Sequence, residues 1–183
     1  MKGRIQTTVF DRTSPGLSAR SLEGFVAEAS RAAGLEGQVT VLITSNSKIR
    51  RLNSRFRGKD SPTDVLSFPA GPLGTGFSGD IAVSLDIAAR NARELGHSLA
   101  EEVRILILHG ILHLAGYDHE NDRGEMEGKE RALRRKLGLP TALIERSRQD
   151  ASSVVRRPPP ARSRTSTKPR RRATDRGPRR SRT

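Results

Sequence analysis

One long apolar run limits the folds that this chain can adopt. Residues 101–115, EEVRILILHGILHLA, are apolar on nearly every side when wound into a helix. Just before this run, Ser98 and Glu101 have the spacing of a capping box, which marks a helix start. A helix without a polar face has to be surrounded by other elements. We therefore expect a layered domain with this helix buried at its centre.

Shorter patterns predict the rest of the domain. Runs rich in β-branched residues predict strands at residues 4–10, 39–44, 64–68 and 79–85. Helical spacing of apolar residues predicts further helices at 18–33, from 45 or 46 to 58, from about 86 to 95, and at about 122–137. In the second of these, Ile49, Leu52 and Phe56 should face inward. The fold class is α/β (α+β), a single layered domain with about four short strands in a mixed sheet packed by about five helices.

The basic charge of the chain is concentrated at its C-terminal end. Residues 147–183 hold 13 Lys and Arg against two Asp, which accounts for +11 of the net charge of +14. The segment is rich in Arg, Pro and Ser and has almost no apolar residues, so burial cannot offset the entropy of ordering it. We predict a folded domain at 1–146 and a disordered basic tail at 147–183.

Cysteine content and hydropathy bear on where the protein works. The absence of Cys excludes a disulfide-stapled module and a cysteine-ligated metal site. No segment has the roughly 20 apolar residues that a membrane span needs, and the N-terminus lacks the apolar core of a signal peptide. We expect a soluble, cytoplasmic protein without membrane contact.

Three of the four histidines lie close together in HGILHLAGYDH. A helix presents His109 and His113, at i and i+4, on one face. Gly116 permits a sharp turn, after which His119 can return as a third ligand and leave one tetrahedral position for water. Burying imidazoles on an apolar helix costs free energy unless something satisfies them. The pattern predicts one catalytic zinc ion per chain.

The same histidine spacing occurs in metzincin zinc peptidases, so a zinc peptidase or other metallohydrolase is an alternative. In those enzymes a glutamate directly follows the first histidine and acts as general base, whereas this chain has Gly110 there. RNA carries its own nucleophile in the 2′-hydroxyl, so loss of that base damages a peptidase more than a ribonuclease. A non-catalytic ribosome-assembly factor stabilised by zinc is the second alternative.

Two long segments and one short one match a known family. HGILHLAGYDH and LNSRFRGKDSPTDVLSFP, with Gly79-Asp80 as a weaker third block, resemble the YbeY family of metallo-endoribonucleases. The resemblance implies single-strand-specific, zinc-dependent RNA cleavage in late ribosomal RNA maturation, at the 3′ end of 16S rRNA, and in ribosome quality control. It also implies that His109, His113 and His119 bind the metal and that Arg57 and His109 act in catalysis. The basic tail is not part of the family's common core.

The chemistry of phosphate supports a role for Arg57. Attack at phosphorus builds negative charge on non-bridging oxygens, and a guanidinium offers them two parallel donors. The alternative is a solvated arginine at the end of a basic helix. Four aspartates are candidates for orienting the histidines, with turn capping as the other role: Asp64, Asp80, Asp118 and Asp122.

RNA binding is expected to rest on phosphate contacts, because the few aromatic residues provide no platform for reading bases. The expected partners are single-stranded or ribosomal RNA and the ribosome, with no small-molecule cofactor. The tail either adds nonspecific affinity for ribosomal RNA or only aids solubility. The basic residues placed to follow an RNA backbone are Lys48, Arg50, Arg51, Arg55, Arg57 and Lys59.

Overall fold

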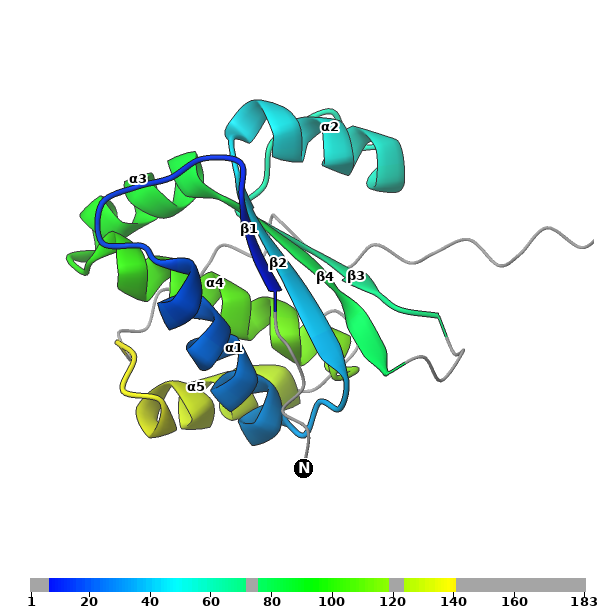
Figure 1. The fold of residues 1–183 in the computed structure, drawn as a ribbon, viewed down its shortest axis with the longest axis vertical. Coiled ribbons are helices and arrows are strands. Elements are labelled where there is room, and N and C mark those ends of the chain that lie inside the picture. Colours follow the sequence, from blue (N-terminus) through cyan, green and yellow to red (C-terminus); the bar gives the residue numbers. More distant parts are fainter. Residues whose placement is uncertain (1–6, 72–75, 119–123, 141–183) are drawn as a thin grey trace, which may run out of the picture.

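A mixed four-stranded β-sheet forms the centre of the part of the chain that the structure describes (Figure 1). The structure is a computed structural model, and it describes residues 7–71, 76–118 and 124–140. In chain order the elements are β1 (Thr7–Phe10), α1 (Ala19–Ala33), β2 (Gln38–Thr44), α2 (Asn46–Arg57), β3 (Val65–Pro69), β4 (Phe77–Ser84), α3 (Leu85–Leu95), α4 (Leu99–Leu114) and α5 (Glu125–Lys136). This order confirms the predicted fold class.

The sheet has the strand order β1-β2-β4-β3. β1, β2 and β4 run parallel, and β3 pairs antiparallel with β4 at the edge. β3 and β4 are joined by only a short connection, which suits antiparallel pairing, whereas the parallel neighbours β1 and β2 are linked through α1. Within the described residues β1 and β3 are therefore the two edge strands, and β3 is close in the chain to the end of α2.

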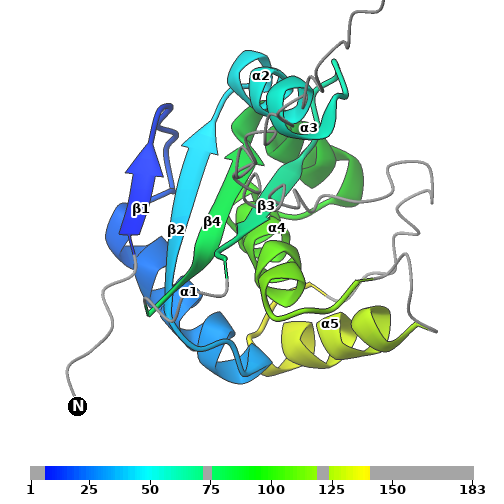
Figure 2. The same cartoon turned by 90° about the vertical axis from the view of Figure 1, so that its right-hand side faces the viewer.

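Residues of the strands alternate between two cores, one on each face of the sheet. In β3, Val65 belongs to the large core with α1 and α4, whereas Leu66 packs in a smaller core with Ile49 of α2. Figure 1 shows α4 and α2 on opposite sides of the sheet, and Figure 2 shows the four strands side by side with β3 at one edge. The edge strand β3 therefore stands between the histidine-bearing helix and the basic helix.

Helix α2 covers its face of the sheet only in part. It begins after the Ser45 cap and ends at Arg57, with Gly58 as its C-cap, close to the predicted bounds, and Ile49 is fully buried. The expectation for Phe56 is wrong, because its side chain is 45% exposed and its ring meets Phe68 edge-on, with centroids 5.3 Å apart. Phe68 belongs to the edge strand, so the last turn of α2 reaches the border of the sheet, where part of the Phe56 ring faces solvent.

Helix α4 has the central position that its apolar run predicts. It packs against α1, α3, α5, β3 and β4. The capping box is present in both directions between Ser98 and Glu101, and these hydrogen bonds from Ser98 hold the pKa of Glu101 below its usual value. The helix ends at Leu114, and Gly116 has a φ of 92°, which lets the chain turn sharply.

Some sequence predictions fall on residues that the structure leaves undescribed. The predicted domain boundary after Arg146 and the tail at 147–183 lie outside the described residues, as do residues 4–6 of the first predicted strand. Among the described residues, no helix is both long and apolar enough to cross a membrane.

Candidate metal centre

His109 and His113 lie side by side near the C-terminal end of α4. Their ring centroids are 4.7 Å apart, and the two Nε2 atoms are separated by 3.1 Å. His113 is 3% exposed, and the His109 side chain is 16% exposed. The helix thus brings two largely buried Nε2 atoms to one point, as the i, i+4 spacing predicts.

Hydrogen bonds at the other ring nitrogens fix where the imidazole protons lie. Nδ1 of His113 donates to the backbone carbonyl of Tyr117 at 3.0 Å, and Nδ1 of His109 donates to Oε2 of Glu130 at 2.9 Å. A carbonyl and a carboxylate can only accept, so each neutral imidazole carries its proton on Nδ1 and a lone pair on Nε2. Two such lone pairs 3.1 Å apart repel each other unless a cation or proton lies close to both.

These donors fit zinc. Zinc–nitrogen bonds of about 2.0–2.1 Å in a tetrahedral site place two ligand nitrogens about 3.3 Å apart, and the observed separation is 3.1 Å. Ligating histidines usually donate their second N–H to a carboxylate or a backbone carbonyl, which are the acceptors found here. The third predicted ligand, His119, lies outside the described residues. Over residues 7–71, 76–118 and 124–140, no group of three or more His, Cys, Asp or Glu could hold a metal.

Glu130 of α5 is the carboxylate at His109, and it was not among the residues predicted from the sequence. Its other oxygen accepts a hydrogen bond from Arg134, so Arg134 holds Glu130 while Glu130 orients His109. The i, i+4 spacing of Glu130 and Arg134 on α5 is visible in the sequence and could have indicated that Glu130 is held in place. However, Glu127 and Arg131 form a pair of the same spacing. Only the packing of α5 on α4 distinguishes Glu130 from Glu127.

The four aspartates considered as supports for the histidines have mixed placements. Asp64 accepts a hydrogen bond from the backbone N–H of Val65 at 2.8 Å, as a turn cap does. Asp80 is exposed on β4, and Asp118 is half-buried beyond the end of α4. Asp122 lies outside the described residues. Turn capping, the alternative role, therefore fits Asp64.

Gly110 occupies the position of the metzincin general base, and it faces the sheet. A Cβ built there would lie 3.0 Å from two methyl carbons of Ile81 and 3.0 Å from Oγ of Ser67. Ser67 also donates a hydrogen bond to the Gly110 carbonyl at 3.3 Å. A side chain at position 110 would start into the packed core instead of toward the imidazoles. The backbone therefore cannot supply a glutamate base from this position.

Arg57 comes from a different element from the histidines. It is the last residue of α2 and is half-buried. Because α2 and α4 lie on opposite faces of the sheet, Arg57 and the two histidines approach from different sides of it (Figure 1). The structure thus brings His109 and His113 together and leaves Arg57 on a separate helix.

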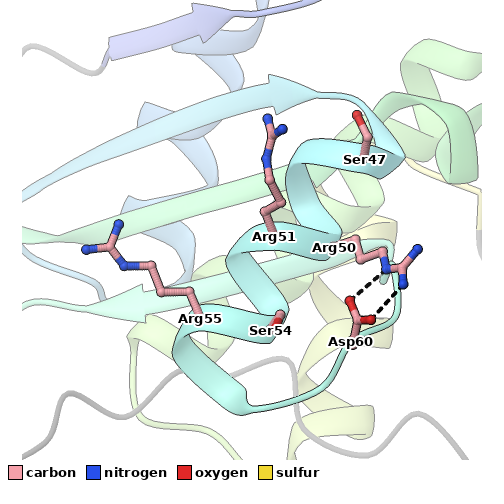
Figure 3. Close-up of a pocket in the computed structure, with 6 residues that line it drawn as sticks. All are labelled: Ser47, Arg50, Arg51, Ser54, Arg55 and Asp60. Carbon is pink, nitrogen blue, oxygen red and sulfur yellow. Dashed lines mark hydrogen bonds and ion pairs between the residues drawn. The ribbon is translucent and has the colours of Figure 1, made fainter.

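An open groove of about 510 Å³ runs along the outer side of α2 (Figure 3). Arg50 and Asp60 form two hydrogen bonds there, at 2.7 and 2.6 Å, which raise the pKa of Arg50 and lower the pKa of Asp60. Arg51 and Arg55 point away from this pair. The groove is lined by Ser47, Arg50, Arg51, Ser54, Arg55 and Asp60.

Comparison with known proteins assigns the chain to a family. Residues 14–138 match the family model described as Endoribonuclease YbeY. The chain belongs to the YbeY family. The matched range contains Arg57, His109, His113 and His119, and it ends before the predicted tail.

Curated relatives named Endoribonuclease YbeY agree with this assignment. The relative from Koribacter versatilis is 58% identical over 142 residues, which cover 78% of this chain and 92% of the relative. The relative from Aquifex aeolicus is 52% identical over 115 residues, 61% of this chain and 76% of the relative. The solution structure of a Thermotoga maritima protein matches with a TM-score of 0.53 and 31% identity, over 73% of this chain and 89% of that protein. The predicted YbeY resemblance is confirmed.

Proposed function

We propose that this chain is a zinc-dependent endoribonuclease that cleaves single-stranded RNA. The observation that carries the proposal is the pair of Nε2 atoms 3.1 Å apart, each on a ring whose Nδ1 proton is committed to an oxygen acceptor. The curated relatives are named endoribonucleases, which supports RNA as the substrate. By the family resemblance, the substrate is ribosomal RNA on the ribosome in the cytoplasm, in late 16S rRNA 3′-end maturation and ribosome quality control.

The functional side chains have two roles, because some bind the metal ion and another binds the phosphate. His109, His113 and His119 would hold the zinc ion, which would supply a concentrated positive charge that stabilises an anionic phosphate. Arg57 donates two parallel hydrogen bonds to the non-bridging phosphate oxygens, on which negative charge grows during in-line attack. Glu130 keeps His109 oriented.

The experiment that tests this function compares three substrates. Purified protein of known zinc content is incubated with single-stranded RNA, with the same RNA as a duplex, and with an unfolded protein. We expect internal cleavage of the single strand, slow or no cleavage of the duplex, and no proteolysis, with cleavage lost on chelation and regained on adding zinc. Proteolysis would favour the peptidase alternative, and a zinc-loaded protein that hydrolyses nothing would support the assembly factor instead.

Replacing Glu130 with glutamine is expected to weaken zinc binding by about 10–100-fold, the usual effect of losing a partner of a ligating histidine. The amide is a weaker acceptor for the Nδ1–H of His109, and it loses its ion pair with Arg134. Competition for zinc against a chromogenic chelator measures the affinity. Glu127→Gln is the matched control, because it removes the same type of ion pair from the same helix. Equal affinities in the two variants would show that Glu130 has no role at the metal.

A further inference from the structure

Phe56 is a large apolar side chain that the fold leaves in solvent. It is 45% exposed, and Val9, on β1, is 46% exposed. The smaller core beneath α2 is built from other residues, namely Ile49, Leu66 and Ala82, with Leu42, Leu52 and Phe68 packed against them. Exposing an aromatic ring costs free energy that a polar residue would avoid. Phe56 is not part of that core, so packing of the core does not explain why position 56 holds an aromatic residue.

The ring of Phe56 retains surface on which another planar group can stack. Its contact with Phe68 is edge-to-face, with planes at 77°. The guanidinium carbon of Arg55 lies over the Phe56 ring, 5.3 Å from its centroid, in a cation–π contact that partly covers one face of the ring. Arg55 is itself exposed and can move toward an anion. The 45% exposed part of the ring, with an exposed cation in contact with it, is thus available to a ligand.

The charges around Phe56 are those that bind a nucleic-acid backbone. Arg55 precedes it and lines the open groove, and Arg57, assigned above to the scissile phosphate, follows it. Phe56 does not line the groove itself but adjoins Arg55, which does. Proteins bind single strands by combining aromatic rings with positively charged grooves, because phosphates meet the cations while a base stacks on the ring. A base in a duplex has both faces covered by its neighbours and cannot stack in this way.

The β3 edge connects this ring to the histidine helix. Phe56 contacts Phe68 on the α2 side, and the adjacent Ser67 donates a hydrogen bond to Gly110 on the α4 side. An RNA strand that passes around this edge can therefore reach both places at once.

We propose that Phe56 stacks on an unpaired nucleobase of the RNA while Arg51 and Arg55 contact the neighbouring phosphates. The inference rests on the proposed function and deepens it, because it assigns the preference for single strands to a particular side chain. It also revises the expectation that no aromatic platform exists for bases.

A tryptophan at position 56 can report the stacking directly, since the chain contains no tryptophan. Full-length Phe56→Trp protein is titrated with single-stranded oligoadenylate in the presence of a chelator, so that cleavage does not interfere. We expect base stacking to quench the tryptophan fluorescence clearly as the oligoadenylate saturates the protein. Inorganic polyphosphate, which carries the charge but no bases, should bind with little quenching. Val9→Trp is the matched control, because Val9 is equally exposed on a strand that α2 does not cover, and its fluorescence should not change.

A second variant measures what the ring contributes to affinity. Phe56→Leu keeps an apolar side chain against Phe68 but removes the flat aromatic face. We expect oligoadenylate affinity to fall about tenfold, within the range for one base–aromatic stack, and polyphosphate affinity to stay unchanged. Fluorescence anisotropy of labelled ligands measures both affinities, and circular dichroism checks the fold of each variant.

Three results would overturn the inference: saturated oligoadenylate binding without quenching, equal quenching by polyphosphate, or unchanged oligoadenylate affinity in Phe56→Leu. The last would leave the ring as a contact for a protein partner. These experiments test the stacking site separately from the proposed nuclease activity. Cleavage of single-stranded RNA without quenching would refute the stacking site alone, whereas quenching without cleavage would support the stacking site and refute the nuclease.

Discussion

Replacing His113 with alanine is expected to reduce bound zinc from about one ion per chain to almost none and to lower RNA cleavage more than 100-fold. Loss of a partner of a ligating histidine already costs about 10–100-fold in affinity, and loss of a ligand costs more. The His113 Nε2 lies 3.1 Å from that of His109, so both are needed at the proposed ion. Elemental analysis after gel filtration measures the zinc, and gel electrophoresis of a labelled RNA measures cleavage.

The control for this variant is another largely buried histidine. The side chain of His97 is 8% exposed, and its Nε2 lies 2.8 Å from Oε2 of Glu102, near the start of α4. His97→Gln keeps a donor for that carboxylate and should retain full zinc and activity. Because His113 is buried, thermal unfolding of His113→Ala establishes that it is folded, and His113→Gln provides a variant closer in volume. Stoichiometric zinc in a folded His113→Ala protein would refute the proposed ligand set.

The elements that were predicted well are those specified by local sequence. The capping box at Ser98 and the apolar run that follows define α4 without information from distant residues. The closeness of His109 and His113 is equally local, because one helical turn separates them. Local geometry therefore sufficed for the fold class and for the closeness of two of the three predicted metal ligands.

The features that were missed depend on contacts between distant elements. Glu130 and Glu127 have the same i, i+4 arginine pairing, and only the docking of α5 on α4 brings Glu130 to His109. Helical periodicity placed Phe56 on the inner face of α2, but the width of the sheet below decides whether that face is covered. The extent of the sheet is a tertiary property that a single helix does not encode.

Replacing Arg57 with alanine is expected to leave about one zinc per chain and to lower the rate of RNA cleavage by about 100–1,000-fold, as for loss of one donor to a developing oxyanion. Arg57 lies on α2, away from the histidine helix, so the metal ligands should be undisturbed. The loss should fall mainly on kcat, because the proposed hydrogen bonds strengthen as charge develops on the phosphate. Single-turnover cleavage of a labelled RNA separates this step from binding.

Two further variants on the same helix distinguish a catalytic role of Arg57 from a general electrostatic contact with the RNA backbone. Arg51→Ala removes an exposed arginine of the groove. It should raise KM and leave kcat unchanged. It should also reduce the slope of the logarithm of the binding constant against the logarithm of the salt concentration by about one. Arg57→Lys keeps the charge but loses the planar pair of donors, so it should recover binding and only part of the rate. Full activity in Arg57→Ala, or a loss confined to KM as in Arg51→Ala, would make Arg57 one more backbone contact and end its assignment to the scissile phosphate.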